Sequence, residues 1–247
     1  MPEDESVLTR PAGAPDKTVR YGTEAEQIAD LRLGDRHTGR RPLVVILHGG
    51  FWKPAYDRTH TGPMAAALAE GGWTVASAEY RRIPGNPDAT LEDVSLLLNH
   101  LRTQTSHHNG RIVLIGHSAG GHLALWAAAT LKETPLLGVL ALAPVADLQL
   151  ARERELGSGA VMAFLGVAPE SRPDLDPRRL PGVAVATTIL HGDADETVPF
   201  AITESYVAAH PDTRLVRLVR TGHYGIIDPL SDAWPTVVEE LRRLSRL

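Results

Sequence analysis

Ser118 has the strongest sequence signs of a nucleophile. It lies in the motif Gly-His-Ser-Ala-Gly at 116–120, directly after the apolar run 111–115 and before an alanine- and leucine-rich stretch. A strand, a sharp turn and a helix in this order hold a serine hydroxyl out of the backbone at strained angles, where a base can activate it. The following helix would point its free N–H groups at the reaction centre. The motif therefore predicts a serine nucleophile.

A serine nucleophile needs a general base, and His223 is the preferred one of the eleven histidines. It lies between Gly222 and Tyr224-Gly225, in a tight loop after the last predicted strand and before the final helix. That is the edge of the sheet to which Ser118 belongs. Tyr224 is a predicted substrate contact beside it.

The base in turn needs an acid that fixes its tautomer. Asp195 is preferred because it follows a predicted strand that ends near position 190. Asp193 lies two positions nearer the strand and is expected to bond loop backbone. Asp147, which follows the preceding strand, stays open as the alternative acid.

An oxyanion formed at Ser118 requires two N–H donors. Ala119 is expected to supply one, and Gly50 or Phe51 the other, because two glycines at 49–50 let the backbone approach a ligand closely. Phe51 and Trp52 are predicted to form a wall of the substrate pocket. Packing of Trp52 in the core is the alternative.

Strands and helices alternate along most of the chain. Continuous apolar strands separated by amphipathic helices predict an α/β fold, a mostly parallel eight-stranded sheet with helices on both faces, and ligands bind such sheets beyond the C-terminal strand ends. Strands are expected at 17–21, 27–33, 43–47, 73–78, 112–115, 137–142, 187–190 and 215–219, and helices at 61–70, 88–102, 119–131, 199–209 and 232–244.

The chain is expected to form a single domain over 17–247, after a poorly ordered lead-in over 1–16 that is broken by several prolines and a glycine. Residues 148–183 are the exception to the strand–helix alternation. A segment of this length is often functional. It is expected either to form a small cap over the strand ends or to be a surface excursion without substrate contact.

Composition narrows the functional classes. The 247 residues contain no cysteine, which excludes disulfides, a thiol nucleophile and cysteine-ligated metals. A net charge of −5 argues against nucleic acid and anionic membranes as partners. No signal peptide or membrane span is expected, and the absence of cysteine is compatible with a cytoplasmic location. Neither a metal nor an organic cofactor is implied. The oligomeric state stays open, with a homodimer among the options.

The order Ser118, Asp195, His223 resembles the triad of the α/β-hydrolase superfamily. Within it, the His-Gly-Gly-Phe-Trp segment at 48–52 is similar to a signature of the kynurenine formamidase (arylformamidase) group. The Tyr-Arg segment at 80–81, followed by Pro84, resembles hormone-sensitive-lipase-like esterases. The resemblance implies that nucleophile, acid and base map onto the three triad residues.

This resemblance and the residues together predict a serine hydrolase that uses acyl transfer. A small carboxylic ester is the first expected substrate class, and an aryl formamide such as N-formylkynurenine is the second. The alternative from another class is a non-catalytic binding protein with a hydrolase fold, although such proteins usually lose a member of the triad.

Overall fold

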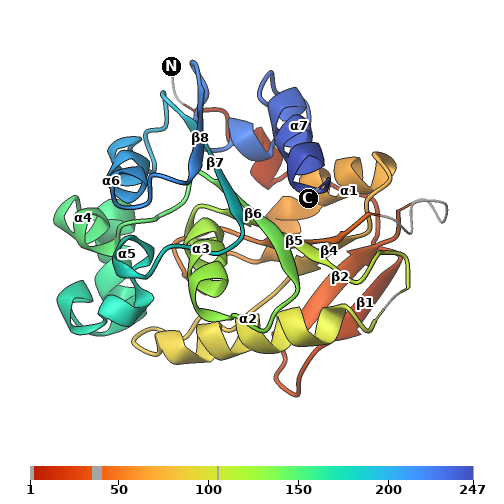
Figure 1. Ribbon diagram of the computed structural model, residues 1–247, viewed down its shortest axis with the longest axis horizontal. Coiled ribbons are helices and arrows are strands. Elements are labelled where there is room, and N and C mark those ends of the chain that lie inside the picture. The colour runs from red at the N-terminus through yellow and green to blue at the C-terminus, as the bar shows by residue number, and fades with distance from the viewer. Residues whose placement is uncertain (1–2, 35–40, 105, 247) are drawn as a thin grey trace.

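The computed structural model describes residues 3–34, 41–104 and 106–246, which form one eight-stranded sheet between layers of helices (Figure 1). β2 runs antiparallel to both of its neighbours, and all other neighbouring pairs are parallel. In spatial order the strands are β1 (Lys17–Arg20), β2 (Ile28–Arg32), β4 (Val75–Ala78), β3 (Leu43–Leu47), β5 (Ile112–His117), β6 (Leu136–Leu142), β7 (Ala186–Gly192) and β8 (Arg214–Leu218). The predicted fold class is confirmed.

Helices cover both faces of the sheet because the central strands are apolar on both sides. In β3, Leu43, Val45 and Leu47 belong to one core, and the alternate residues Val44 and Ile46 belong to the other. α2 (Pro87–Leu101), α3 (Ala119–Thr130) and α6 (Ala201–Ala209) bury residues in the first core, and α1 (Gly62–Glu70) and α7 (Trp234–Leu244) do so in the second (Figure 1).

The segment between β6 and β7 forms short helices. It contains α4 (Leu148–Glu153), α5 (Leu156–Leu165) and the 3₁₀ turns η4 (Pro169–Ser171), η5 (Pro173–Leu175) and η6 (Pro177–Arg179). Asp147 caps α4 by accepting the N–H of Leu150 at 2.8 Å. Gly157, Ser158 and Gly159 have left-handed backbone angles that kink the start of α5. Pro169, Pro173 and Pro177 each begin one of the three 3₁₀ turns, where a missing backbone N–H costs no hydrogen bond.

Residues 3–16 differ from the poorly ordered lead-in that was expected. Val7, in the short turn η1 (Ser6–Leu8), is buried in the core on the α1 and α7 face. The Arg10 guanidinium pairs with Asp228, just after the turn η7 (Gly225–Ile227), and Glu3 accepts the N–H of Tyr224 at 3.0 Å. These contacts with the C-terminal third are not visible in the local composition. The expectation for residues 1 and 2 lies outside the described residues.

Within the described ranges, the helices are too short or too polar to cross a membrane.

Candidate active site

Ser118 occupies the turn between β5 and α3 with φ +56° and ψ −119°, a strained backbone conformation. Three backbone hydrogen bonds hold it: its N–H donates to Leu142, and its carbonyl accepts the N–H groups of His122 and Val145. A Cβ at Gly120 would lie 2.1 Å from the Leu47 carbonyl oxygen, so only glycine permits this close approach of helix and strand. The turn predicted around Ser118 thus forms as the sequence suggested.

Asp195 and His223 are joined directly. The Nδ1–H of His223 donates to Asp195 Oδ2 over 2.7 Å. Asp195 Oδ1 accepts the N–H groups of Thr197 and Val198 at 2.9 and 2.7 Å. Because Nδ1 of His223 is engaged, its Nε2 is the nitrogen left to meet a nucleophile.

The two other carboxylates weighed as the acid are engaged elsewhere. Asp193 accepts the Arg220 N–H at 2.6 Å and lies 3.2 Å from Arg217. Asp147 caps α4 and accepts the Ser205 hydroxyl at 2.6 Å. Of the three candidates, Asp195 is the one that the structure brings to His223.

Asp195 has a further partner that the sequence did not single out. His191 Nε2 lies 3.2 Å from Asp195 Oδ2 and 2.8 Å from the Val198 carbonyl, and its Nδ1 lies 2.7 Å from the Thr203 hydroxyl. Burial alone would raise the pKa of Asp195, but the hydrogen bonds from His191 and His223 hold it well below its usual range. Asp195 therefore stays ionised and can orient the His223 ring through the hydrogen bond to Nδ1.

Ser118 and His223 line one cavity of about 190 Å³, which we call the Ser118 cavity. Gly50, Phe51 and Tyr224 line it too, as the sequence predicted for a substrate site. Six lining residues outside the 148–183 segment were not indicated by the sequence: Leu8, Lys53, Tyr56, His60, His117 and Thr197. Gly157 and Ser158 of α5 complete one side, so the 148–183 segment does reach the site.

The predicted oxyanion donors lie beside Ser118. A Cβ at Gly49 would lie 3.0 Å from Ser118 Cβ, which places the 49–51 backbone against Ser118. Within the described ranges, the N–H groups of Gly50 and Phe51 donate to no protein acceptor. Ala119 is the first residue of α3, a position whose N–H has no partner inside the helix. All three N–H groups are thus available to an oxyanion.

A buried polar network behind the 48–52 loop fixes its shape. The Tyr80 hydroxyl donates to the His48 carbonyl at 2.7 Å, and the His48 ring stacks on Tyr80 with centroids 4.4 Å apart. His48 Nε2 donates to Glu79 at 3.0 Å, and Arg82 also binds that carboxylate. Burial opposes ionisation of Glu79, but the bonds from His48 and the charge of Arg82 outweigh it and lower its pKa to about 2.

Trp52 differs from its expected role. It is 4 % exposed, stacks on Phe164 with centroids 4.6 Å apart, and meets the His122 ring edge-on at 5.1 Å. It is not among the residues that line the Ser118 cavity. Phe51 and Trp52 both have a positive φ, of +52° and +54°, but Phe51 lines the cavity and Trp52 packs in the core. The alternative reading, core packing, describes its position.

Two histidines of the cavity are poor proton acceptors. Burial lowers the pKa of His60 to about 4, and burial together with the charge of His223 lowers that of His117 well below its usual value. His117 Nε2 donates to the carbonyl of His223 at 3.0 Å. Within the described ranges, no cluster of three or more His, Asp or Glu side chains is placed to hold a metal.

The sheet and the serine on its strand-to-helix turn define an α/β-hydrolase fold. A family model described as BD-FAE matches residues 29–209, more than half of the sequence. The chain therefore belongs to the BD-FAE family.

Curated relatives match part of the chain. Kynurenine formamidase of Salmo salar is 38 % identical over 107 residues, which cover 43 % of this chain and 36 % of that protein. The probable carboxylic ester hydrolase LipM of Mycobacterium tuberculosis is 36 % identical over 98 residues, covering 38 % of this chain and 22 % of its own length. The match thus spans well under half of either relative.

Solved structures share the fold over nearly the whole chain. Esterase B of Lactobacillus rhamnosis, inhibited by a tributyrin phosphonate, superimposes with a TM-score of 0.76 at 19 % identity, over 95 % of this chain and 87 % of that one. A truncated carbohydrate esterase from gut microbiota gives a TM-score of 0.76 at 16 % identity, over 95 % and 98 %. At this identity the likeness is one of fold.

Proposed function

We propose that this protein is a serine hydrolase that cleaves small carboxylic esters or activated amides through an acyl-enzyme. The hydrogen bond of 2.7 Å between Asp195 and His223, with His223 and Ser118 on the same cavity, carries the proposal. Esterases and formamidases among the relatives support the same reaction class.

In this mechanism, His223 Nε2 takes the Ser118 proton as Ser118 Oγ bonds to the carbonyl carbon. The N–H groups of Ala119 and of the 50–51 turn stabilise the resulting oxyanion, and loss of one such donor typically costs about 10²–10³ in turnover. The imidazolium then protonates the leaving alkoxide or amine as the acyl–oxygen or acyl–nitrogen bond breaks. Water, deprotonated by His223, releases the acid and regenerates Ser118.

The second candidate is an arylformamidase. The 38 % identity with the Salmo salar kynurenine formamidase supports it. Turnover of p-nitrophenyl acetate, its longer-chain homologues and N-formylkynurenine separates the two, because an esterase without formamidase activity would leave N-formylkynurenine intact.

A fluorophosphonate probe tests the nucleophile. We expect the wild-type protein to be labelled and Ser118→Ala to be unlabelled, since the probe bonds only to an activated serine. Ser158→Ala is the matched control, because Ser158 lines the same cavity but lacks the strand-to-helix turn. Labelling that survives in Ser118→Ala and disappears in Ser158→Ala would exclude Ser118 as the nucleophile, and a wild-type protein that is not labelled at all would favour the non-catalytic alternative.

A further inference from the structure

The charged side chains that line the Ser118 cavity are of one sign. Among its described lining residues, Lys53 is the only lysine or arginine, and neither aspartate nor glutamate is present. His60 stays neutral near pH 7 because burial lowers its pKa to about 4. Aromatic and small side chains make up most of the remaining wall. The cavity therefore pairs the nucleophile with a lone alkylammonium.

The protein holds Lys53 in place without neutralising it. Its Nζ donates to the Gly157 carbonyl at 2.8 Å and lies 5.9 Å from the centre of the Phe51 ring. Its backbone N–H donates to Gly50 at 3.0 Å, so Lys53 is tied to the loop that supplies the predicted oxyanion donors. Across the described parts of the chain, no carboxylate lies within 4.0 Å of Nζ.

An ammonium group has three N–H donors, and the Gly157 carbonyl takes one. Lys53 is half-buried, so part of its hydration has been lost without an ionic partner to compensate. An anionic group of a bound molecule would restore that partner through charge-assisted hydrogen bonds. A cavity of about 190 Å³ leaves room for only a short group between Lys53 and Ser118.

We propose that Lys53 is a specificity-determining residue that selects ester or amide substrates bearing a carboxylate a few atoms from the scissile carbonyl. The inference rests on the proposed hydrolase function and names its substrate class. The carboxylate belongs either to the acyl half or to the leaving half of the substrate. A carboxylate in either half would bind the Lys53 ammonium in the same way, and the experiment distinguishes the two halves.

Two substrate pairs test the inference. For the acyl half, the mono-p-nitrophenyl ester of glutaric acid is compared with its methyl-capped diester. For the leaving half, 4-acetoxybenzoate is compared with its methyl ester. The measured quantity is the ratio of kcat/KM for the anionic member to that for the neutral member, after subtraction of the uncatalysed rate.

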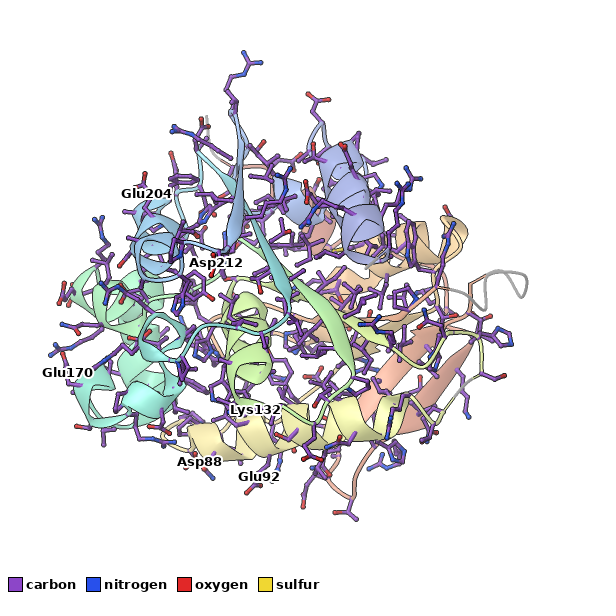
Figure 2. All side chains as sticks on the ribbon, viewed as in Figure 1. Asp88, Glu92, Lys132, Glu170, Glu204 and Asp212 are labelled. Atoms are coloured by element: carbon purple, nitrogen blue, oxygen red, sulfur yellow. The ribbon has the colours of Figure 1, made fainter. Side chains whose placement is uncertain are left out.

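The variants are Lys53→Met, which keeps length without charge, and Lys53→Arg, which keeps the charge. We expect Lys53→Met to lower the ratio roughly tenfold or more for one pair, in line with a lost hydrogen bond to a charged group, and Lys53→Arg to restore most of it. Lys132→Met is the matched control. Lys132, which Figure 2 labels, follows the far end of α3. The 12 residues of this helix span about 18 Å and separate Lys132 from Ser118, so the loss of Lys132 should leave the ratio unchanged.

The pair that responds identifies the half that carries the carboxylate. Hydrolysis that depends on Ser118 but shows the same ratio in Lys53→Met as in the wild type overturns the inference and leaves the proposed function standing. Absence of any Ser118-dependent hydrolysis of the four compounds refutes the proposed function, and the inference falls with it.

Discussion

The carboxylate of Asp195 accepts four hydrogen bonds, two on each oxygen, and this makes Asp195→Asn an informative perturbation. Oδ1 binds the N–H groups of Thr197 and Val198, and Oδ2 binds His223 and His191. An asparagine has a single acceptor oxygen. If that oxygen stays on the two backbone donors, the amide NH₂ faces both imidazoles.

The consequence falls on the tautomer of His223. Facing an NH₂ group, Nδ1 of His223 must become an acceptor, so the ring proton moves to Nε2. Nε2 then cannot take the Ser118 proton. The corresponding change in a Ser-His-Asp triad lowers kcat by about 10⁴, which is about 5.5 kcal/mol of transition-state stabilisation at 1.36 kcal/mol per tenfold. We expect a loss of that size here.

Two matched carboxylates serve as controls. Asp193→Asn and Asp147→Asn also remove one negative charge each. Asp193 contacts the Arg217 side chain, and Asp147 accepts the hydroxyl of Ser205. We expect kcat for p-nitrophenyl acetate to stay within about tenfold of the wild type in both, a change of at most about 1.4 kcal/mol. Circular dichroism checks that each variant is folded. Near-normal kcat in Asp195→Asn, together with a large loss in Asp147→Asn, would refute the assignment and return the role of acid to Asp147.

Two further predictions concern buried carboxylates outside the triad. Burial raises the pKa of Asp176 from 3.8 to about 6, so its ionisation above pH 4 favours the unfolded chain by up to about 3 kcal/mol. Asp176→Asn should therefore be more stable than the wild type to urea at pH 7.5 but not below pH 4, and an equal difference at both values would contradict this. The pKa of Glu79 is instead lowered, from 4.5 to about 2, so its contribution is lost as pH falls below 4.5. Glu79→Gln leaves Arg82 without its ionic partner, so we expect the variant to be less stable than the wild type by about 3–5 kcal/mol at pH 7. The difference should be smaller at pH 3. If thermal melts showed the same difference at both pH values, the charge of Glu79 would not be its cause.

The sequence was informative wherever the signal was local. Strands such as Leu43–Leu47 consist of consecutive apolar residues, and the structure places them within a few positions of the expected ranges. The turn at Ser118 was predictable because strand, glycines and helix are contiguous in the chain. The choice of Asp195 over Asp193 also followed from local position, since the residue nearer the strand bonds the loop backbone and its arginine neighbours.

Several site residues were missed because their roles depend on loop geometry or on distant partners. His191 is only four positions before Asp195, but the sequence does not show that the intervening loop brings the Asp195 carboxylate within 3.2 Å of its ring. Lys53 and Leu8 reach the Ser118 cavity only because segments far apart in sequence pack together. For Trp52, the residue type indicated an aromatic wall of the pocket, but its ring packs against Phe164 and His122 in the core.

Contacts between the two ends of the chain have a consequence for how the protein is made. Glu3 with Tyr224 and Arg10 with Asp228 join positions 221 and 218 residues apart, and Leu8 lies between them on the cavity wall. Contacts across such long loops form late in folding, because closing the loop costs conformational entropy before any contact stabilises the closed form. A ribosome-bound chain whose residues 223–228 are still inside the ribosome therefore has Ser118 without the finished cavity, which closes only after this segment has emerged.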